Sequence, residues 1–311
     1  MSTALITHPD ALEHVTPQGH PERVARLERV LEELSEPRFA DLVRHEAPLA
    51  EDAELLRCHP PEYLQRIRHA IPAAGIYQLD ADTHVSPGSL RAAQRAVGGA
   101  CRAVDMVLAG DVTNAFVAMR PPGHHAETAT PMGFCLFGTV AIAAKRALDH
   151  HGLERVAVVD FDVHHGNGTQ DLLWSEGRAL FVSSHQMPLW PGSGAPDERG
   201  AHGTVLNLPL PPDADGTAFR AAWSEHALPR LRDFAPQLLL VSAGFDSHRA
   251  DPLANLSLED DDFAWITAEL CALAREACAG RLVSVLEGGY DLDALGRCVA
   301  AHVQVLKDNG Q

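Results

Sequence analysis

Six short and almost uninterrupted apolar runs constrain the fold of this chain more than any other feature. Each run has four to six residues, is rich in Val, Leu and Phe, and ends at Gly, Pro or a polar residue. The runs are 114–119, 156–160, 179–183, 205–208, 238–242 and 282–286. Runs of this kind are typical of strands that are buried on both faces of a parallel sheet.

Stretches with apolar residues at helical spacing alternate with these runs. The expected helices are a pattern over 24–34 that Pro21 opens and Pro37 ends, followed by 89–108, 140–150, 218–234 and 262–279. This alternation predicts an α/β fold, with a mainly parallel central sheet flanked by helices and joined by right-handed crossovers. The 311 residues contain no internal repeat and no Gly/Ser linker, so we expect one domain over 1–311.

Polar clusters follow five of the six runs. The clusters are Arg120–Ala126, Asp160–Gly168, Ser183–His185, Ala243–Asp246 and Glu287–Asp291. The carboxyl ends of parallel strands meet at one edge of a sheet, which is where such folds bind ligands. One cluster would be a decorated loop, but five in the same topological place predict a convergent site.

Asp162 and His164 are two residues apart at the end of a predicted strand, so their side chains point to the same side. Together they suit a divalent metal ion. Asp246, at the end of another run, is the best candidate for a third ligand, and three ligands leave a coordination position for water and substrate. The alternative for an isolated Asp-x-His is a hydrogen-bonded pair, but the surrounding polar residues favour the metal.

Two adjacent histidines, His124 and His125, follow a rigid Pro-Pro-Gly turn. Buried imidazoles need acceptors for their ring N–H groups, and Asp160 and Asn167 are the expected partners. A carboxylate raises the basicity of an imidazole more than an amide does. We therefore expect one histidine to act as a base on the metal-bound water and the other to be a mostly neutral or electrostatic partner.

Tyr290 follows Gly288 and Gly289 and is one of only three tyrosines. Flanking glycines let the backbone approach a ligand closely. A phenol aimed at a carbonyl would stabilise a developing oxyanion. The alternative is a turn tyrosine with a solvated hydroxyl.

Taken together, these residues resemble the histone deacetylase superfamily, which has an arginase-like α/β fold. The resemblance runs from His20-Pro-Glu-Arg23 to Gly288-Gly-Tyr290 and includes the motifs at 120–126, 160–168, 244–246 and 287–290 in the family's order. The Arg-Pro-Pro-Gly-His-His form, the loop 80–89 and Asn at position 167 resemble the class II branch. The resemblance implies a zinc-dependent deacetylase that cleaves an acetamide on an amine, with one zinc per chain.

The resemblance also implies roles for individual residues. Asp162, His164 and Asp246 would bind zinc, His125 would be the general base, and Tyr290 would polarise the acetyl carbonyl. Gly133 and Phe134 match one wall of a substrate tunnel, Trp190 the other wall, and Asp82 a rim carboxylate. A structural potassium ion is expected near Asp160, Asp162, His164 and Ser183. Arg26 matches an inner-channel arginine.

Three other functions compete with this one. The arginase branch uses two manganese ions and needs an Asp-x-Asp, whereas this chain reads Gly-Phe-Asp-Ser-His over 244–248. Acetylpolyamine hydrolysis is closer, but Leu253 stands where specialised relatives place an acidic residue at the rim. A non-enzymatic scaffold would have lost a ligand, a histidine or the tyrosine, and this chain keeps them all.

The composition of the chain limits which binding partners and which cellular location we expect for the protein. The net charge of −17 argues against a nucleic-acid or membrane-surface binder, whose binding face is basic. The six cysteines show no CxxC spacing, which favours reduced thiols. Without a signal-like start or a long apolar run we expect a cytoplasmic protein. The expected partner is an acylated lysine peptide or small acylated amine, and the oligomeric state stays open.

Overall fold

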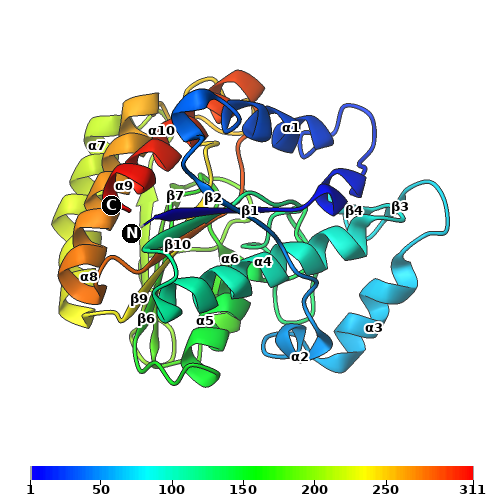
Figure 1. Cartoon of the computed structure of the whole chain (residues 1–311), viewed down its shortest axis with the longest axis horizontal. Coiled ribbons are helices and arrows are strands. Elements are labelled where there is room, and N and C mark those ends of the chain that lie inside the picture. Colours follow the sequence, from blue (N-terminus) through cyan, green and yellow to red (C-terminus); the bar gives the residue numbers. More distant parts are fainter. Residues whose placement is uncertain (1, 311) are drawn as a thin grey trace.

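A central eight-stranded sheet organises the molecule (Figure 1), and the computed structural model describes residues 2–310. The strand order is β2-β1-β5-β10-β9-β6-β7-β8, and every neighbouring pair is parallel. The strands are β1 Thr3–Thr7, β2 Val43–Glu46, β5 Asn114–Val117, β6 Val156–Asp160, β7 Ala179–Gln186, β8 Val205–Leu210, β9 Leu238–Ala243 and β10 Leu282–Leu286. A short antiparallel hairpin pairs β3 Tyr77–Gln78 with β4 His84–Val85. The predicted α/β architecture is confirmed.

Helices cover both faces of the sheet. They are α1 Val24–Glu33, α2 Asp52–Leu55, α3 Pro61–Ala70, α4 Ser89–Ala109, α5 Thr139–Asp149, α6 Asn167–Leu173, α7 Gly216–Ala222, α8 Leu228–Phe234, α9 Asp260–Cys278 and α10 Leu292–Asn309. Short 3₁₀ turns occupy Pro9–Glu13 and Pro37–Phe39. Helices α1, α9 and α10 pack together on one face, and α4 and α5 pack together on the other (Figure 1).

Most of the predicted elements are present, with a few corrections. All six apolar runs are strands, and the expected helix over 218–234 is α7 and α8 joined by a π turn over Trp223–Ala227. The first helix begins at Val24 and not at Pro21, because the backbone is still extended at Arg23. The cluster Ser183–His185 lies inside β7 and does not follow it, since β7 continues to Gln186.

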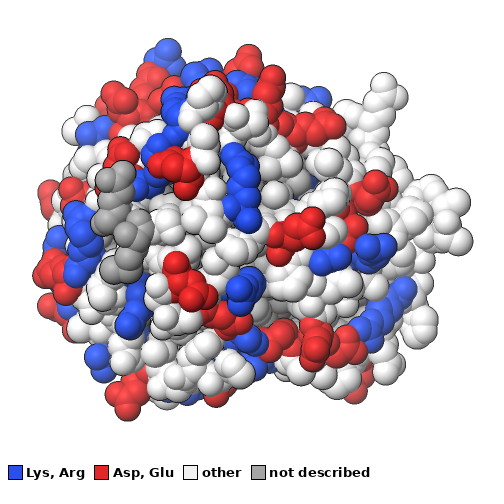
Figure 2. Space-filling model, in the orientation of Figure 1, with Lys and Arg blue, Asp and Glu red and all other residues white. Residues whose placement is uncertain are grey.

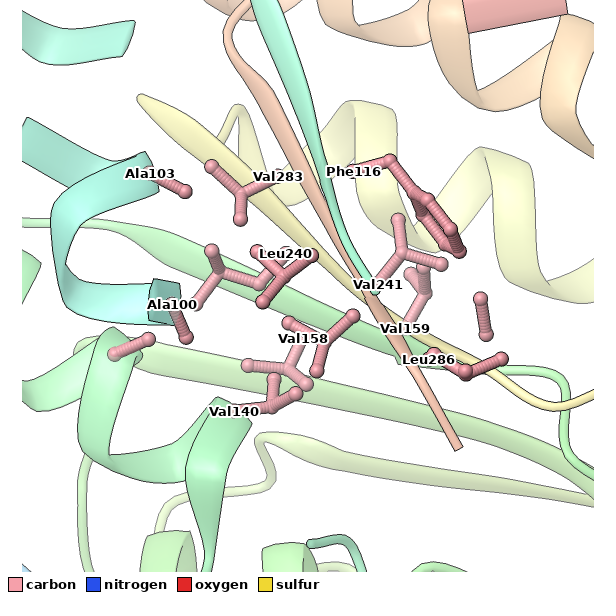
Figure 3. Packing of buried hydrophobic residues seen from close by; sticks show 14 of the residues in the cluster. Ala100, Ala103, Phe116, Val140, Val158, Val159, Leu240, Val241, Val283 and Leu286 are labelled. Atoms are coloured by element: carbon pink, nitrogen blue, oxygen red, sulfur yellow. The ribbon is translucent and has the colours of Figure 1, made fainter. Parts of the chain in front are cut away.

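Apolar side chains on the two faces of the central strands form the core. Val158 and Val159 are consecutive in β6 and therefore point to opposite faces. Figure 3 shows Val158 on the side of α4 and α5, near Ala100 and Val140, while Val159 lies on the other side near Val241. Full burial of such a side chain contributes about 1.5–3 kcal/mol, which explains why near-continuous apolar runs become central strands.

The surface charges are mixed (Figure 2), and the cysteine side chains are buried. Acidic and basic side chains are interspersed on the face drawn in Figure 2, so the negative charge is not gathered into one patch there. All six cysteines lie within the described residues as buried free thiols. No helix in residues 2–310 combines the length and the apolar character that crossing a bilayer requires.

Candidate metal centre and tunnel

Three predicted metal ligands converge where β6 and β9 end side by side. The Nδ1 atom of His164 lies 3.2 Å from Asp162 Oδ1 and 3.2 Å from Asp246 Oδ2. The backbone N–H groups of His164 and Gly288 also donate to Asp162, and that of Val163 donates to Asp246. Both carboxylates are buried, at 0% and 1% exposure. The sequence placed these ligands on separate strands, and the fold brings them together.

The donor set fits a divalent cation. Neither buried carboxylate forms an ion pair with a Lys or Arg of residues 2–310, so His164 is the cationic partner that the two share. Burial lowers the pKa of His164, but hydrogen bonds to Asp162 and Asp246 outweigh it and raise that pKa to about 10. Burial and the charge of Asp162 raise the pKa of Asp246. A metal ion would replace the imidazole proton and neutralise the same carboxylates.

Within the described residues one other group has metal-binding geometry, formed by His248, Asp260 and Cys298. The polar atoms of this group already form hydrogen bonds with one another and with neighbouring residues. The Nδ1 atom of His248 accepts the N–H of Ala250, so its Nε2 carries the proton and donates to Asp260 at 3.1 Å. Arg297 and the Cys298 thiol also donate to Asp260. This group is therefore a hydrogen-bonded network that joins α9 to α10.

The two adjacent histidines have different partners, as expected from the sequence. His124 Nδ1 lies 3.0 Å from Asp160 Oδ2, and His125 Nδ1 lies 2.8 Å from Asn167 Oδ1. Burial lowers the pKa of His124, but the charges of Asp162 and Asp160 raise it well above its usual range. Burial, together with the charges of His124 and of His164, holds the pKa of His125 well below its usual range. His124 is thus the charged ring and His125 the neutral one.

The tautomer of His125 follows from its amide partner. The Nδ2 group of Asn167 donates to Glu127 and to the Met132 sulfur, so Oδ1 is the atom that faces the imidazole. A carbonyl oxygen only accepts, and His125 Nδ1 must therefore carry the proton. The Nε2 atom keeps its lone pair for a proton acceptor role.

Sequence reasoning gave Glu287 no role, although the residue was part of a recognised cluster. Its buried carboxylate accepts the N–H groups of Gly123 at 2.7 Å and His124 at 3.2 Å, and the hydroxyl of Ser242 at 3.1 Å. Burial raises the pKa of Glu287 to about 7, against the opposing charge of His124. Glu287 therefore fixes the turn that carries the two histidines. The sequence feature that could have identified Glu287 is its charge, since it directly follows the buried strand β10.

A second support of this turn was also missed. The guanidinium of Arg120 pairs with both oxygens of Glu22, at 2.7 and 2.5 Å, and the two side chains are buried. Arg26 and His14 approach the same carboxylate. This network ties the segment before α1 to the turn of the two histidines.

A cavity of about 170 Å³ leads to the metal ligands. Its lining residues are Asp82, His125, Gly133, Phe134, His164, Leu189, Trp190, Leu253 and Tyr290. A larger cavity of about 280 Å³ lies between α4, the segment 48–54 and Arg146 of α5, and contains none of these residues. The tunnel residues expected from the sequence are thus brought together, with Leu189 as an addition.

Aromatic rings form the walls of this cavity. The ring of Trp190 lies 4.7 Å from that of His125, and the ring of Phe134 lies 5.8 Å from that of Tyr290, measured between centroids. Gly133 has a φ of 55°, and a Cβ there would lie 2.6 Å from the Trp190 ring and 2.7 Å from His125 Cγ, and closer still to His125 Cδ2. Asp82 Oδ1 accepts the N–H of Gly133 at 3.1 Å, so this carboxylate fixes the wall at the rim.

Tyr290 is 8% exposed and faces the cavity, instead of lying in a solvated turn. Burial raises the pKa of its phenol well above the usual value, so the hydroxyl keeps its proton for donation. Arg26 lies 4.8 Å over its ring and donates to the carbonyls of Gly289 at 2.6 Å and Glu287 at 2.5 Å. Arg26 is thus buried behind the tyrosine.

The residues expected near potassium lie at the ends of two neighbouring strands. Asp160, the last residue of β6, is paired in register with Ser183 of β7. Asp162 and His164 follow in the same loop, and Asp160 Oδ1 accepts the N–H of Asp162 at 3.0 Å. The Ser183 hydroxyl lies 3.0 Å from His185 Nδ1.

Comparisons with known proteins agree with this geometry. Residues 20–306 match the histone deacetylase domain, and the chain therefore belongs to the histone deacetylase family. This is a family of deacetylases and amidohydrolases, which are hydrolases.

Three individual proteins illustrate the similarity to this family. The histone deacetylase-like amidohydrolase of Pseudomonas aeruginosa is 42% identical over 86% of this chain and 71% of its own length. The polyamine deacetylase HDAC10 of Homo sapiens is 37% identical over 98% of this chain and 48% of its own length. The crystal structure of the HDA15 HD domain superposes with a TM-score of 0.94 at 31% identity, covering 99% of this chain and 88% of that one.

Proposed function

We propose that this chain is a zinc-dependent amide hydrolase that removes acetyl or related acyl groups from lysine side chains or similar amines. The observation that carries the proposal is the convergence of Asp162, His164 and Asp246 below a narrow aromatic cavity. His125 and Tyr290 line the same cavity. On this proposal, residues 1–311 form one cytoplasmic deacetylase domain.

One zinc ion would be held by Asp162, His164 and Asp246, whose buried carboxylates form no ion pair with a Lys or Arg among the described residues. When bound, zinc supplies a Lewis acid for the carbonyl and lowers the pKa of water. A structural potassium ion would be held near Asp160, Asp162, His164 and Ser183, largely through backbone oxygens. The register of β6 and β7 supports this second ion by placing Asp160 beside Ser183.

His125 would take the proton of the attacking water. Its pKa is depressed by burial and by the charge of His124, so the ring is neutral and Nε2 is free to accept. Asn167 holds the ring in that tautomer through Nδ1. His124, charged and paired with Asp160, would stabilise the negative charge that develops.

The hydroxyl group of Tyr290 would donate a hydrogen bond to the carbonyl oxygen of the substrate and keep its own proton. A hydrogen bond of this kind strengthens as the oxygen becomes an oxyanion, and its loss typically costs about 10²–10³ in kcat. Gly288 and Gly289 allow the tyrosine backbone to lie close to the metal ligands, since a Cβ at Gly288 would lie 2.5 Å from Asp162 Oδ2.

Phe134 and Trp190 would hold the methylene stem of the substrate, and Asp82 at the rim would accept its backbone amide. The rim position Leu253 is apolar and offers no anchor for a remote ammonium group, which favours acyl-lysine over acetylpolyamines. The polyamine alternative is supported by the likeness to a polyamine deacetylase and by the negative net charge.

A substrate panel tests the proposal. Release of the free carboxylate, which is acetate or the longer acyl acid, is measured for acetyl-lysine peptides, longer acyl-lysine peptides, acetylspermidine and acetylputrescine, with Tyr290→Phe as the matched low-activity variant. We expect the peptides to have the higher kcat/KM and Tyr290→Phe to lose kcat while it keeps its zinc. A tenfold preference for the polyamines, about 1.4 kcal/mol in transition-state binding, would favour the alternative. Absence of hydrolysis of every amide would refute the proposal.

A further inference from the structure

Asp251 is a buried carboxylate close to the site that none of the roles above uses. It is 7% exposed and lies in the loop after β9, five positions beyond the ligand Asp246. Its own N–H donates to the carbonyl of His248 at 2.8 Å, which holds the loop in a tight turn. The carboxylate therefore has a fixed position relative to the metal ligand.

Three backbone N–H groups are the partners of this carboxylate. Its Oδ2 accepts from Tyr290 at 2.7 Å and from Asp291 at 3.3 Å, and its Oδ1 accepts from Leu253 at 3.0 Å. Within residues 2–310 no Lys, Arg or His forms an ion pair with it. Its hydrogen bonds thus go to the backbone of the tyrosine loop and of the tunnel mouth.

The loop over residues 288–291, here called the tyrosine loop, needs such an anchor because its two glycines leave many backbone conformations open to it. Gly288 and Gly289 precede Tyr290, and Gly289 has a φ of 121°, a region that other residues rarely adopt. The Tyr290 ring packs against Phe134 and Arg26, but its main-chain N–H is held by Asp251. Without the carboxylate, the loop would retain the ring contacts and lose the bond that sets its main chain.

We propose that Asp251 is a positioning residue that holds the Tyr290 hydroxyl at the reacting carbonyl and fixes Leu253 at the tunnel mouth. This inference rests on the proposed function, because it assigns Asp251 an effect on the step that Tyr290 serves. One side chain thereby couples the loop of a metal ligand, the tunnel mouth and the oxyanion donor. Burial and the charge of Asp246 raise the pKa of Asp251 to about 7, and the three N–H groups oppose that rise.

A double-mutant cycle with Tyr290 separates positioning from general structure. Asp251→Ala removes all three hydrogen bonds, and Asp251→Asn leaves an oxygen for only one side. We expect each to lower kcat for an acetyl-lysine peptide at least tenfold, with KM changed less than threefold and zinc content unchanged. In the Tyr290→Phe background we expect the same substitutions to change kcat less than twofold, because the hydroxyl they position is absent.

Asp291→Asn is the matched control. Asp291 is adjacent to Tyr290, but its carboxylate caps α10 by accepting the N–H of Ala294 at 2.8 Å, a role that Asn also fills. We expect this variant to keep the wild-type kcat. Equal losses from Asp251→Asn in the wild-type and Tyr290→Phe backgrounds would overturn the inference, and so would an unchanged kcat in both Asp251 variants. An inactive wild type would instead refute the proposed function.

Discussion

A single methyl group at position 288 should disrupt the metal centre. In Gly288→Ala, the added Cβ would lie 2.5 Å from Asp162 Oδ2 and nearer still to Asp246 Oδ2, whereas real Cβ contacts are essentially never under 3.0 Å. The carboxylates would have to move by roughly half an ångström or more, and neither has room because both are buried. Displacements on the order of 1 Å cost about 10²-fold in rate, and disturbed ligand support costs about 10–100-fold in metal affinity.

Zinc affinity measured by competition with a chromophoric chelator checks this directly. Gly288→Ala should bind zinc at least tenfold more weakly than wild type, and acetate release should fall by about 10² at limiting zinc. Gly177→Ala is the control, because its Cβ would meet only the His202 ring at 3.2 Å, and that ring is exposed. A Gly288→Ala protein with zinc affinity within twofold of wild type would refute the assignment of these carboxylates to the metal.

Further predictions concern stability and the tunnel. Glu22→Gln leaves Arg120 buried without its ion-pair partner and should lower the free energy of unfolding by about 3–5 kcal/mol in urea titrations, whereas a loss under 1 kcal/mol would contradict the pairing. His302 is buried, and burial lowers its pKa to about 3. The neutral imidazole therefore contributes fully to the free energy of unfolding above pH 6.5, and this contribution declines as the pH falls towards 3. At pH 5 the loss of unfolding free energy from this group amounts to about 2 kcal/mol. The decline in urea midpoint between pH 7.5 and pH 5 should therefore be smaller in His302→Gln than in the wild type. Phe134→Ala should raise KM for an acetyl-lysine peptide about tenfold with zinc retained, and an unchanged KM would exclude Phe134 as a tunnel wall.

The sequence predicts the centre of the fold better than its edges. Val156–Asp160 and Leu282–Leu286 are strands with the predicted bounds, because both faces are buried and every position except the final Asp160 is apolar or small. Strand β2, at the sheet edge, reads Val-Arg-His-Glu and is buried only in part, so no apolar run marks it. Helix α6 begins at Asn167-Gly168, a pair typical of turns, and its burial against neighbouring segments overrides that preference.

The residues of the candidate site were also predictable only in part. Asp162, His164 and Asp246 were predictable because they are polar residues at the ends of buried strands, and a parallel sheet places those ends together. Trp190 was expected only through the family resemblance and not from the strand pattern, since its loop is held by Glu198, which accepts the N–H groups of Gly194 and Ala195. Contacts between a side chain and distant backbone amides leave no periodic pattern in a sequence.

Reconstitution of the metal-free protein with zinc tests whether one zinc ion, held by Asp162, His164 and Asp246, is required for amide hydrolysis. The protein is stripped with a chelator, and acetate release from an acetyl-lysine peptide is followed as zinc is added in known amounts. We expect activity to rise in proportion to zinc and to reach its maximum at one zinc per chain, and we expect Asp246→Ala to stay inactive. Full activity in the stripped protein, or a maximum at two metal ions per chain, would contradict this expectation.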